Sequence, residues 1–154
     1  MTTGTVTDMA GLRASVGQHL GYSDWQEMTQ ERVDQFADAT DDHQFIHVDP
    51  ERAKATPFGG TIAHGLFTLS LGPVFNDEVW TMTGVAFALN YGYEKVRFPA
   101  PVPVDSKLRM RATLAEVTDV AGGVQARVTQ TFEIEGGAKP VCVAESLVRI
   151  YAAQ

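Results

Sequence analysis

The chain has 154 residues, 44% of them hydrophobic and 20% charged, a composition typical of one soluble globular domain. Its formal net charge of −7 argues against nucleic acid or an anionic membrane as a partner, because phosphate groups bind basic surfaces. A single cysteine, Cys142, excludes an intrachain disulfide framework, and neither a signal-peptide pattern nor a long apolar run is present, so a cytoplasmic location is expected.

The first half of the chain predicts mainly helices. In chain order we expect a short helix over 8–16, a short strand over 22–29, a helix over 30–40, a loop over 41–49 and a helical turn over 50–55. Thr29 is suited to cap the helix that follows it, and Pro50 suits the first position of a helical turn.

A longer helix is predicted within residues 57–80. Its apolar side chains cover nearly the whole circumference as far as Phe75, which indicates a helix buried on all sides. Gly72 and Pro73 are expected to kink or interrupt it, because proline removes a helical hydrogen bond.

The second half predicts four antiparallel strands, over about 85–94, 105–119, 124–134 and 140–151. Glycine pairs at 122–123 and 136–137 predict tight turns. In the first strand the large residues Phe87, Leu89, Tyr91 and Tyr93 are expected on one face. No repeat or linker divides the chain, so we expect one α+β domain over 1–154, a curved antiparallel sheet wrapped around a long central helix.

Titratable residues are concentrated in the stretch "DATDDHQFIHVDP". Asp42 and His47 lie where a helix ends and a loop begins, and a carboxylate and an imidazole that share one water form a general base and acid pair. A solvated helix end is the alternative for such a pattern taken alone. His43, His47 and Asp49 are an alternative metal set, but no third-ligand pattern stands out and no metal is expected.

His64 and Gly65 are predicted to open the central helix. The first N–H groups of a helix are unpaired and lie at the positive end of its dipole, where they stabilise an oxyanion. Gly65 permits close approach of a ligand carbonyl.

Three stretches together resemble one family. The segments "FADATDDHQFIHVDP", "TIAHGLFTLSL" and "KVRFPAPVPVDSKL" are similar to those of the MaoC-like (R)-specific enoyl-CoA hydratases and 3-hydroxyacyl-thioester dehydratases, over about residues 20–150. The resemblance implies a hotdog fold. The family motif reads approximately G-D-x-N-P-x-H, followed downstream by H-G at the start of the central helix.

The resemblance assigns roles residue by residue. It places Asp42 and His47 as the catalytic pair and the N–H of Gly65 as the oxyanion donor. The chain departs from the motif at three positions, with aspartate for glycine, glutamine for asparagine and phenylalanine for proline, at Asp41, Gln44 and Phe45. Aspartate tolerates a left-handed backbone better than most residues, so the turn is expected to survive.

The implied activity is a hydro-lyase reaction, the reversible hydration of a trans-2-enoyl thioester to the (R)-3-hydroxyacyl thioester. The substrate carrier would be CoA or acyl carrier protein, with no metal or other cofactor. Gln44, His64, Phe67 and Arg97 are candidate substrate-binding residues. The resemblance also implies a homodimer, which an exposed sheet edge favours. Two alternatives remain: an acyl-CoA thioesterase on the same fold, and a non-catalytic acyl-thioester binding protein.

Overall fold

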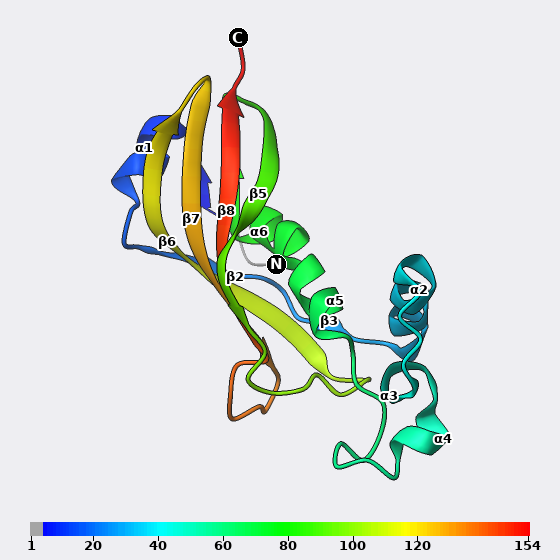
Figure 1. Ribbon diagram of the computed structural model, residues 1–154. Coiled ribbons are helices and arrows are strands. Elements are labelled where there is room, and N and C mark those ends of the chain that lie inside the picture. The colour runs from blue at the N-terminus through cyan, green and yellow to red at the C-terminus, as the bar shows by residue number, and fades with distance from the viewer. Residues whose placement is uncertain (1–4) are drawn as a thin grey trace.

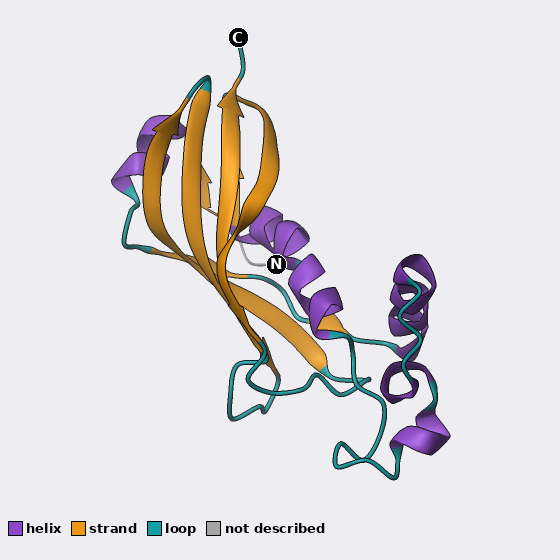
Figure 2. Cartoon of the chain, in the orientation of Figure 1, coloured by secondary structure: helices purple, strands orange, loops and turns teal. Residues whose placement is uncertain are grey.

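The computed structural model describes residues 5–154 and contains a curved antiparallel sheet with helices on its inner side (Figures 1 and 2). The strands run in the order β2-β6-β7-β8-β5, with β3 also paired to β6. Their bounds are β2 His19–Tyr22, β3 Gln26–Glu27, β5 Val85–Arg97, β6 Lys107–Val120, β7 Gly123–Ile134 and β8 Cys142–Ala152. The predicted α+β architecture and its four long strands are confirmed, and the strand predicted over 22–29 is instead two short ones.

Alternation along β7 shows why these residues form a two-faced sheet. Val124, Ala126, Val128, Gln130 and Phe132 are buried on the side of the helices, while the residues that alternate with them are only partly covered. The predicted turn before β7 is present, and Gly122 adopts a φ of 82°, which suits glycine.

Strand β5 differs from its predicted pattern. Phe87 and Leu89 pair with Tyr151 and Arg149, which point away from the core. Register shifts follow, and Tyr93 pairs with the buried Ser146. The prediction that all four large residues share one face is therefore wrong, because a bulge changes which face the following residues occupy.

The central helix is divided in two. Helix α5 (Gly65–Ser70) ends at Leu71, and α6 (Gly72–Val79) follows with proline in its first turn. Phe75 is fully buried, and its ring lies 6.1 Å from that of Phe132 on β7. The predicted interruption is confirmed, but burial on all sides is wrong for the single chain, since Leu66 is 61% and Val74 45% exposed.

The N-terminal part contains one predicted helix and one strand that the sequence did not predict. Helix α1 (Met9–Ala14) is present as expected, capped by the Asp8 side chain. Strand β1 (Thr5–Thr7) pairs in parallel with β4 (Trp80–Met82) in a separate two-stranded sheet. The pairing of β1 with β4 depends on contacts between segments far apart in sequence, which no local sequence pattern predicts.

Three helices lie beyond the N-terminal end of α5, away from the sheet (Figure 1). They are α2 (Gln30–Thr40), α3 (Phe45–Val48) and α4 (Pro50–Ala53). Thr29 caps α2 as predicted, whereas the stretch expected to be a loop contains the turn of α3. Among residues 5–154 no helix is long and apolar enough to cross a membrane.

Candidate active site

Asp42 is placed by a left-handed turn at the end of α2. The C-cap residue Asp41 has φ 59° and ψ 20°, the conformation that helices commonly adopt where they end. The family motif has glycine at this position, and aspartate is one of the few other residues that adopt this conformation readily. The turn leaves the Asp42 side chain exposed, and the Gln44 N–H lies 3.4 Å from its Oδ1.

His47 lies on α3 and is 7% exposed. Its Nδ1 donates to the carbonyl oxygen of Ile62 at 2.7 Å, so the unprotonated nitrogen of the neutral ring is Nε2. Burial is the largest influence on its pKa, and His64 nearby acts in the same direction. Together they lower the pKa of His47 below its usual value, although the Ile62 carbonyl and Asp42 oppose this.

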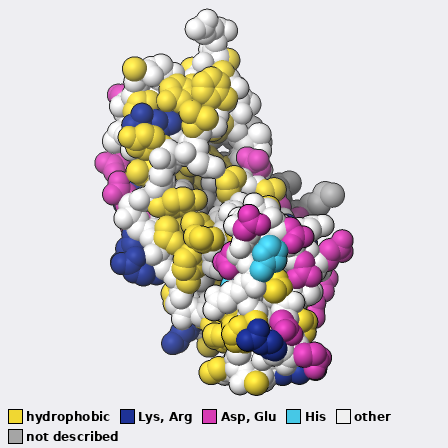
Figure 3. All heavy atoms as spheres, turned by 45° about the vertical axis from the view of Figure 1, so that its right-hand side comes forward, with side chains coloured by type: hydrophobic (Ala, Val, Ile, Leu, Met, Phe, Trp, Pro, Cys, Tyr) yellow, Lys and Arg dark blue, Asp and Glu magenta, His cyan; other side chains and the backbone are white. Residues whose placement is uncertain are grey.

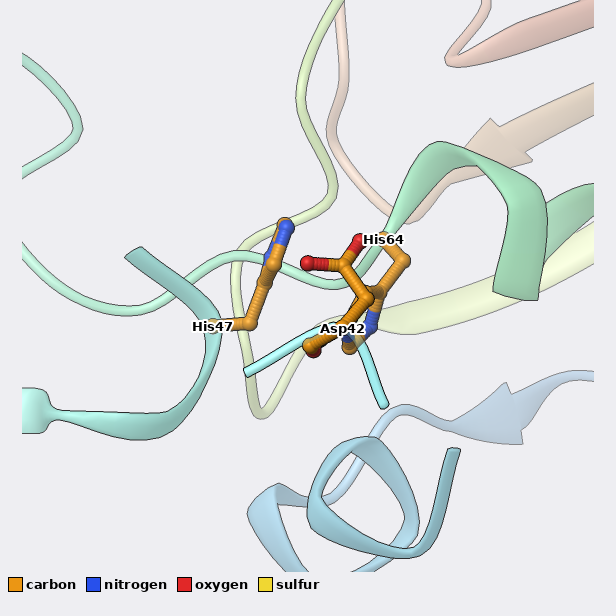
Figure 4. A group of neighbouring side chains, drawn as sticks. All are labelled: Asp42, His47 and His64. Carbon is orange, nitrogen blue, oxygen red and sulfur yellow. The ribbon is translucent and has the colours of Figure 1, made fainter. Parts of the chain in front are cut away.

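The side chains of Asp42, His47 and His64 converge (Figure 4). A carboxylate oxygen of Asp42 and a ring nitrogen of each histidine lie within 4.8 Å of one another. One water that donates at about 2.8 Å to two acceptors bridges a gap of this size. The arrangement therefore suits a water held between the carboxylate and a neutral imidazole.

The same cluster is a poor match for a metal ion. The rings of His47 and His64 are stacked, with centroids 3.8 Å apart and planes 24° apart. A metal lies in the plane of an imidazole about 2 Å from its nitrogen, and two stacked rings have no such point in common. The alternative set is not assembled either, because His43 bonds to Asp38 and Asp49 caps α4.

Gly65 is the first residue of α5, and its N–H has no hydrogen-bond acceptor within residues 5–154. A Cβ built on Gly65 would lie 3.0 Å from the ring of Phe98, so this ring packs directly against the glycine. Phe98 is 43% exposed and forms part of the surface beside the donor. Its position follows from the fold, and the sequence contains no signal for it.

The other two departures from the motif are accommodated locally. Phe45 occupies the first position of α3, where proline is favoured in helices but not required. The guanidinium of Arg52 lies 4.2 Å from the centroid of its ring. Gln44 has φ −56° and ψ 136°, the extended conformation that also precedes proline. The turn thus keeps a backbone suited to the motif without the proline.

The four predicted substrate-binding residues lie in different surroundings, and their role stays a prediction. Gln44 is exposed beside Asp42, and Arg97 is exposed at the end of β5, next to Phe98. Phe67 is 8% exposed and stacks on Phe36 with centroids 5.0 Å apart. His64 is 3% exposed and contacts the predicted catalytic residues Asp42 and His47 rather than the surface.

Two site residues were missed by sequence reasoning. Ile62 contributes only its carbonyl, for which a side-chain pattern carries no signal. Gln30 donates to the carbonyl of His47 at 2.7 Å and accepts from the Thr61 hydroxyl at 2.6 Å. Its amide thereby joins the start of α2 to the backbone of α3 and to the segment before α5.

A cavity of about 500 Å³ lies beside α6, between this helix and the β4, β5 and β8 strands. It is lined mainly by apolar and small polar side chains, among them Asn76, Trp80, Met82, Ala88, Asn90 and Val148, and also by the carboxylate of Asp77. The cavity is on the concave side of the sheet, since Val148 is buried there and pairs with Asn90.

The backbone at Asp41 leads to a stability prediction. Replacing Asp41 with valine should lower the free energy of unfolding by about 1–2 kcal/mol, because a β-branched residue is strained in left-handed conformation. Asp41→Gly should cause no comparable loss, since glycine adopts this conformation freely. Urea unfolding of both variants measures the difference, and equal stability of the two would contradict it.

The lowered pKa of His47 leads to a pH prediction. A histidine whose folded pKa is depressed favours the folded state above its unfolded pKa of about 6.5, and this stability is lost as the pH falls below that value. The urea midpoint should therefore fall less between pH 7 and 5 in His47→Gln than in the parent. His43→Gln is the control. His43 is exposed and its hydrogen bond to Asp38 raises its pKa, so this substitution should not reduce the fall in the urea midpoint between pH 7 and 5.

Comparison with known proteins gives consistent matches over nearly the whole chain. Residues 12–135 match the family model described as MaoC like domain. The 3-hydroxyacyl-thioester dehydratase Z of Mycobacterium tuberculosis is 56% identical over 96% of this chain and 99% of its own. Nodulation protein N of Rhizobium leguminosarum bv. viciae is 42% identical over 88% of this chain and 86% of its own.

Comparison with solved structures also gives matches over most of the chain. The unliganded R-hydratase PhaJ1 of Pseudomonas aeruginosa superposes with a TM-score of 0.73 at 22% identity, covering 90% of this chain and 83% of that one. The expected hotdog fold is therefore confirmed.

Proposed function

Because the chain belongs to the MaoC-like domain family, we propose that it is a 3-hydroxyacyl-thioester dehydratase that also catalyses the reverse hydration of trans-2-enoyl thioesters. One observation carries the proposal. The Asp42 carboxylate and a neutral His47 are separated by the width of one water, close to the segment that leads into α5 and its free Gly65 N–H. This reaction needs two groups that bind and deprotonate a water, and a hydrogen-bond donor for the developing enolate.

The proposed mechanism adds one water across the double bond. Asp42 and Nε2 of His47 each accept a hydrogen bond from the water, and Asp42 takes one proton as the oxygen bonds to C3. The thioester oxygen gains negative charge, which the Gly65 N–H stabilises. Asp42 then gives the proton that it took from the water to C2 on the same face, so Asp42 is ionised again and His47 stays neutral. Dehydration is the reverse sequence.

The test is the absorbance of the conjugated enoyl thioester, followed after the protein is added to crotonyl-CoA and to longer trans-2-enoyl-CoAs. We expect the absorbance to fall without release of free thiol. Thiol release would instead identify a thioesterase, in which Asp42 activates water against the carbonyl. Tight binding without any conversion would identify an acyl-thioester binding protein, and either result would overturn the proposal.

The cavity beside α6 is proposed to take the far end of a long acyl chain. Asn76 lies eleven positions after Gly65 across the two consecutive helices, which corresponds to roughly 16 Å at 1.5 Å per residue. Ala88→Trp should fill the cavity and lower kcat/KM for a twelve-carbon enoyl-CoA by about 10-fold or more, with crotonyl-CoA unaffected. Ala86→Trp, outside the lining, is the control. Equal losses on both chain lengths would contradict this placement.

We further propose that the chain forms a homodimer through β5. This strand ends the sheet, and Leu66 and Val74 of the neighbouring helices are exposed together with Phe87, Leu89 and Tyr91. Figure 3 shows hydrophobic side chains gathered on this side of the molecule. Light scattering should give twice the mass of one chain. The mass of a single chain would contradict the dimer, and activity only after mixing with a different MaoC-like chain would indicate a heteromer.

The thioester carrier is proposed to be CoA or acyl carrier protein. Exposed acidic side chains cover α2, among them Glu31, Asp34 and Asp38, so neither anionic carrier is expected to lie on that helix. Comparison of kcat/KM for the crotonyl thioesters of the two carriers distinguishes them.

A further inference from the structure

His64 contacts both members of the proposed catalytic pair. Its ring stacks on that of His47 with centroids 3.8 Å apart. Its Nε2 lies 2.9 Å from the main-chain carbonyl oxygen of Asp42, and because a carbonyl only accepts, Nε2 carries the proton and donates. One side chain therefore connects the turn that carries Asp42 to the helix that carries His47.

The His64 ring also contacts a second aromatic ring. Phe36 of α2 lies with its ring centroid 4.8 Å from that of His64, and Phe36 in turn stacks on Phe67 of α5. The ring is 3% exposed, so it has little freedom to move without displacing its neighbours. These four rings, two stacked pairs joined by the tilted contact between Phe36 and His64, connect α2, α3 and α5 next to the proposed catalytic pair.

The imidazole of His64 also has a destabilising feature. Nδ1 of His64 is buried and has no hydrogen-bond partner within residues 5–154. A buried acceptor without a partner is destabilising, and a phenyl ring would fill the same space without it. His64 is the N-cap residue of α5 but makes no side-chain capping bond. What the imidazole adds over a phenyl ring is therefore its hydrogen bond to Asp42.

We propose that His64 is a positioning residue that holds Asp42 and His47 at the separation of one water, through its hydrogen bond to one and its ring stacked on the other. The inference rests on the proposed dehydratase activity. It assigns His64 no contact with substrate, in contrast to the substrate-binding role expected from the sequence. Misplacement of catalytic groups by about 1 Å commonly costs on the order of 10²-fold in rate, which sets the scale of the expected effect.

Three variants separate the two contacts. His64→Phe keeps a stacked ring and loses the donor, whereas His64→Gln places an amide N–H near the position of Nε2 and loses the ring. His64→Leu loses both. We expect His64→Leu to lower kcat about 10²-fold with KM nearly unchanged. His64→Phe and His64→Gln should each retain more activity than His64→Leu, because each keeps one of the contacts.

The control is Phe75→Leu, a core change against Phe132 that destabilises the fold without touching the site. Its kcat should match the parent at a temperature where both are folded. A raised KM with parental kcat in the His64 variants would assign His64 to substrate binding and overturn the proposal. Parental kcat in both His64→Phe and His64→Gln would also overturn it, and those two variants decide the matter if His64→Leu does not fold.

An NMR measurement separates this inference from the proposed function. The chain has four histidines, so the His47 ring signals can be assigned with His47→Gln. His64 lowers the pKa of His47, so the titration midpoint of His47 should rise in His64→Phe whatever the reaction catalysed. An unchanged midpoint together with parental kcat in His64→Phe and His64→Gln overturns the positioning role. A raised midpoint in a protein without turnover supports the contact and rejects the dehydratase.

Discussion

Replacing Asp42 with asparagine is expected to lower kcat for the hydration of crotonyl-CoA by about 10²–10⁴-fold while leaving the fold intact. Asparagine keeps the size of the side chain and its hydrogen-bonding oxygen but cannot take a proton from water. Asp42 is exposed, so the change leaves no cavity and no unpaired buried group. Turnover is measured by the loss of enoyl-thioester absorbance, and folding by circular dichroism.

The neighbouring Asp41 provides a matched control. Asp41→Asn removes the same charge one residue away, and asparagine accepts the left-handed backbone found there. Its kcat should stay close to that of the parent. A loss in Asp41→Asn equal to that in Asp42→Asn would mean that local charge, rather than the base, controls the rate. Parental activity in Asp42→Asn would remove Asp42 from the mechanism.

Replacing Gly65 with proline is expected to lower kcat by about 10²–10³-fold, the usual cost of losing one oxyanion donor. Proline removes the N–H that has no acceptor within residues 5–154, and it is well tolerated at the first position of a helix. The preceding residue, His64, has φ −59° and ψ 134°, which a following proline accepts. The backbone is therefore compatible with the substitution.

Gly65→Ala isolates the contribution of the N–H. Both substitutions add a Cβ that lies about 3.0 Å from the Phe98 ring, but alanine keeps the donor. Activity much higher in Gly65→Ala than in Gly65→Pro would identify the N–H as the functional group. Equal losses in the two would assign the effect to the contact with Phe98 and contradict the oxyanion role. Kinetics with saturating crotonyl-CoA distinguish kcat from KM in both variants.

The two halves of the chain differed in how well the sequence predicted them. The four long strands carry alternating residues and glycine turns, which are local signals, and all four appear within a few residues of their predicted bounds. Helix α2 was equally clear because its cap and its apolar stripe lie in one short segment. The pairing of β1 with β4 and the bulges of β5 were not predicted, because both depend on contacts with distant strands.

The sequence by itself determined that this is an α+β chain whose long antiparallel strands form a sheet around a central helix, and it identified Asp42, His47 and Gly65 as candidate site residues. Periodicity, caps and a family motif are encoded within short stretches, and so they can be read without coordinates. The left-handed turn at Asp41 was open to the same reasoning, because the residue type is suited to it.

Only the tertiary structure decided how these residues are held. The contact of His47 with the Ile62 carbonyl, the ring contacts of His64 with His47 and Phe36, and the ring of Phe98 against Gly65 join segments far apart in sequence. No sequence pattern predicts which hydrogen-bond donor a backbone carbonyl will accept from, or which ring another ring will pack against. Such contacts exist only once the chain has packed, because the position of each group is set by the elements that surround it.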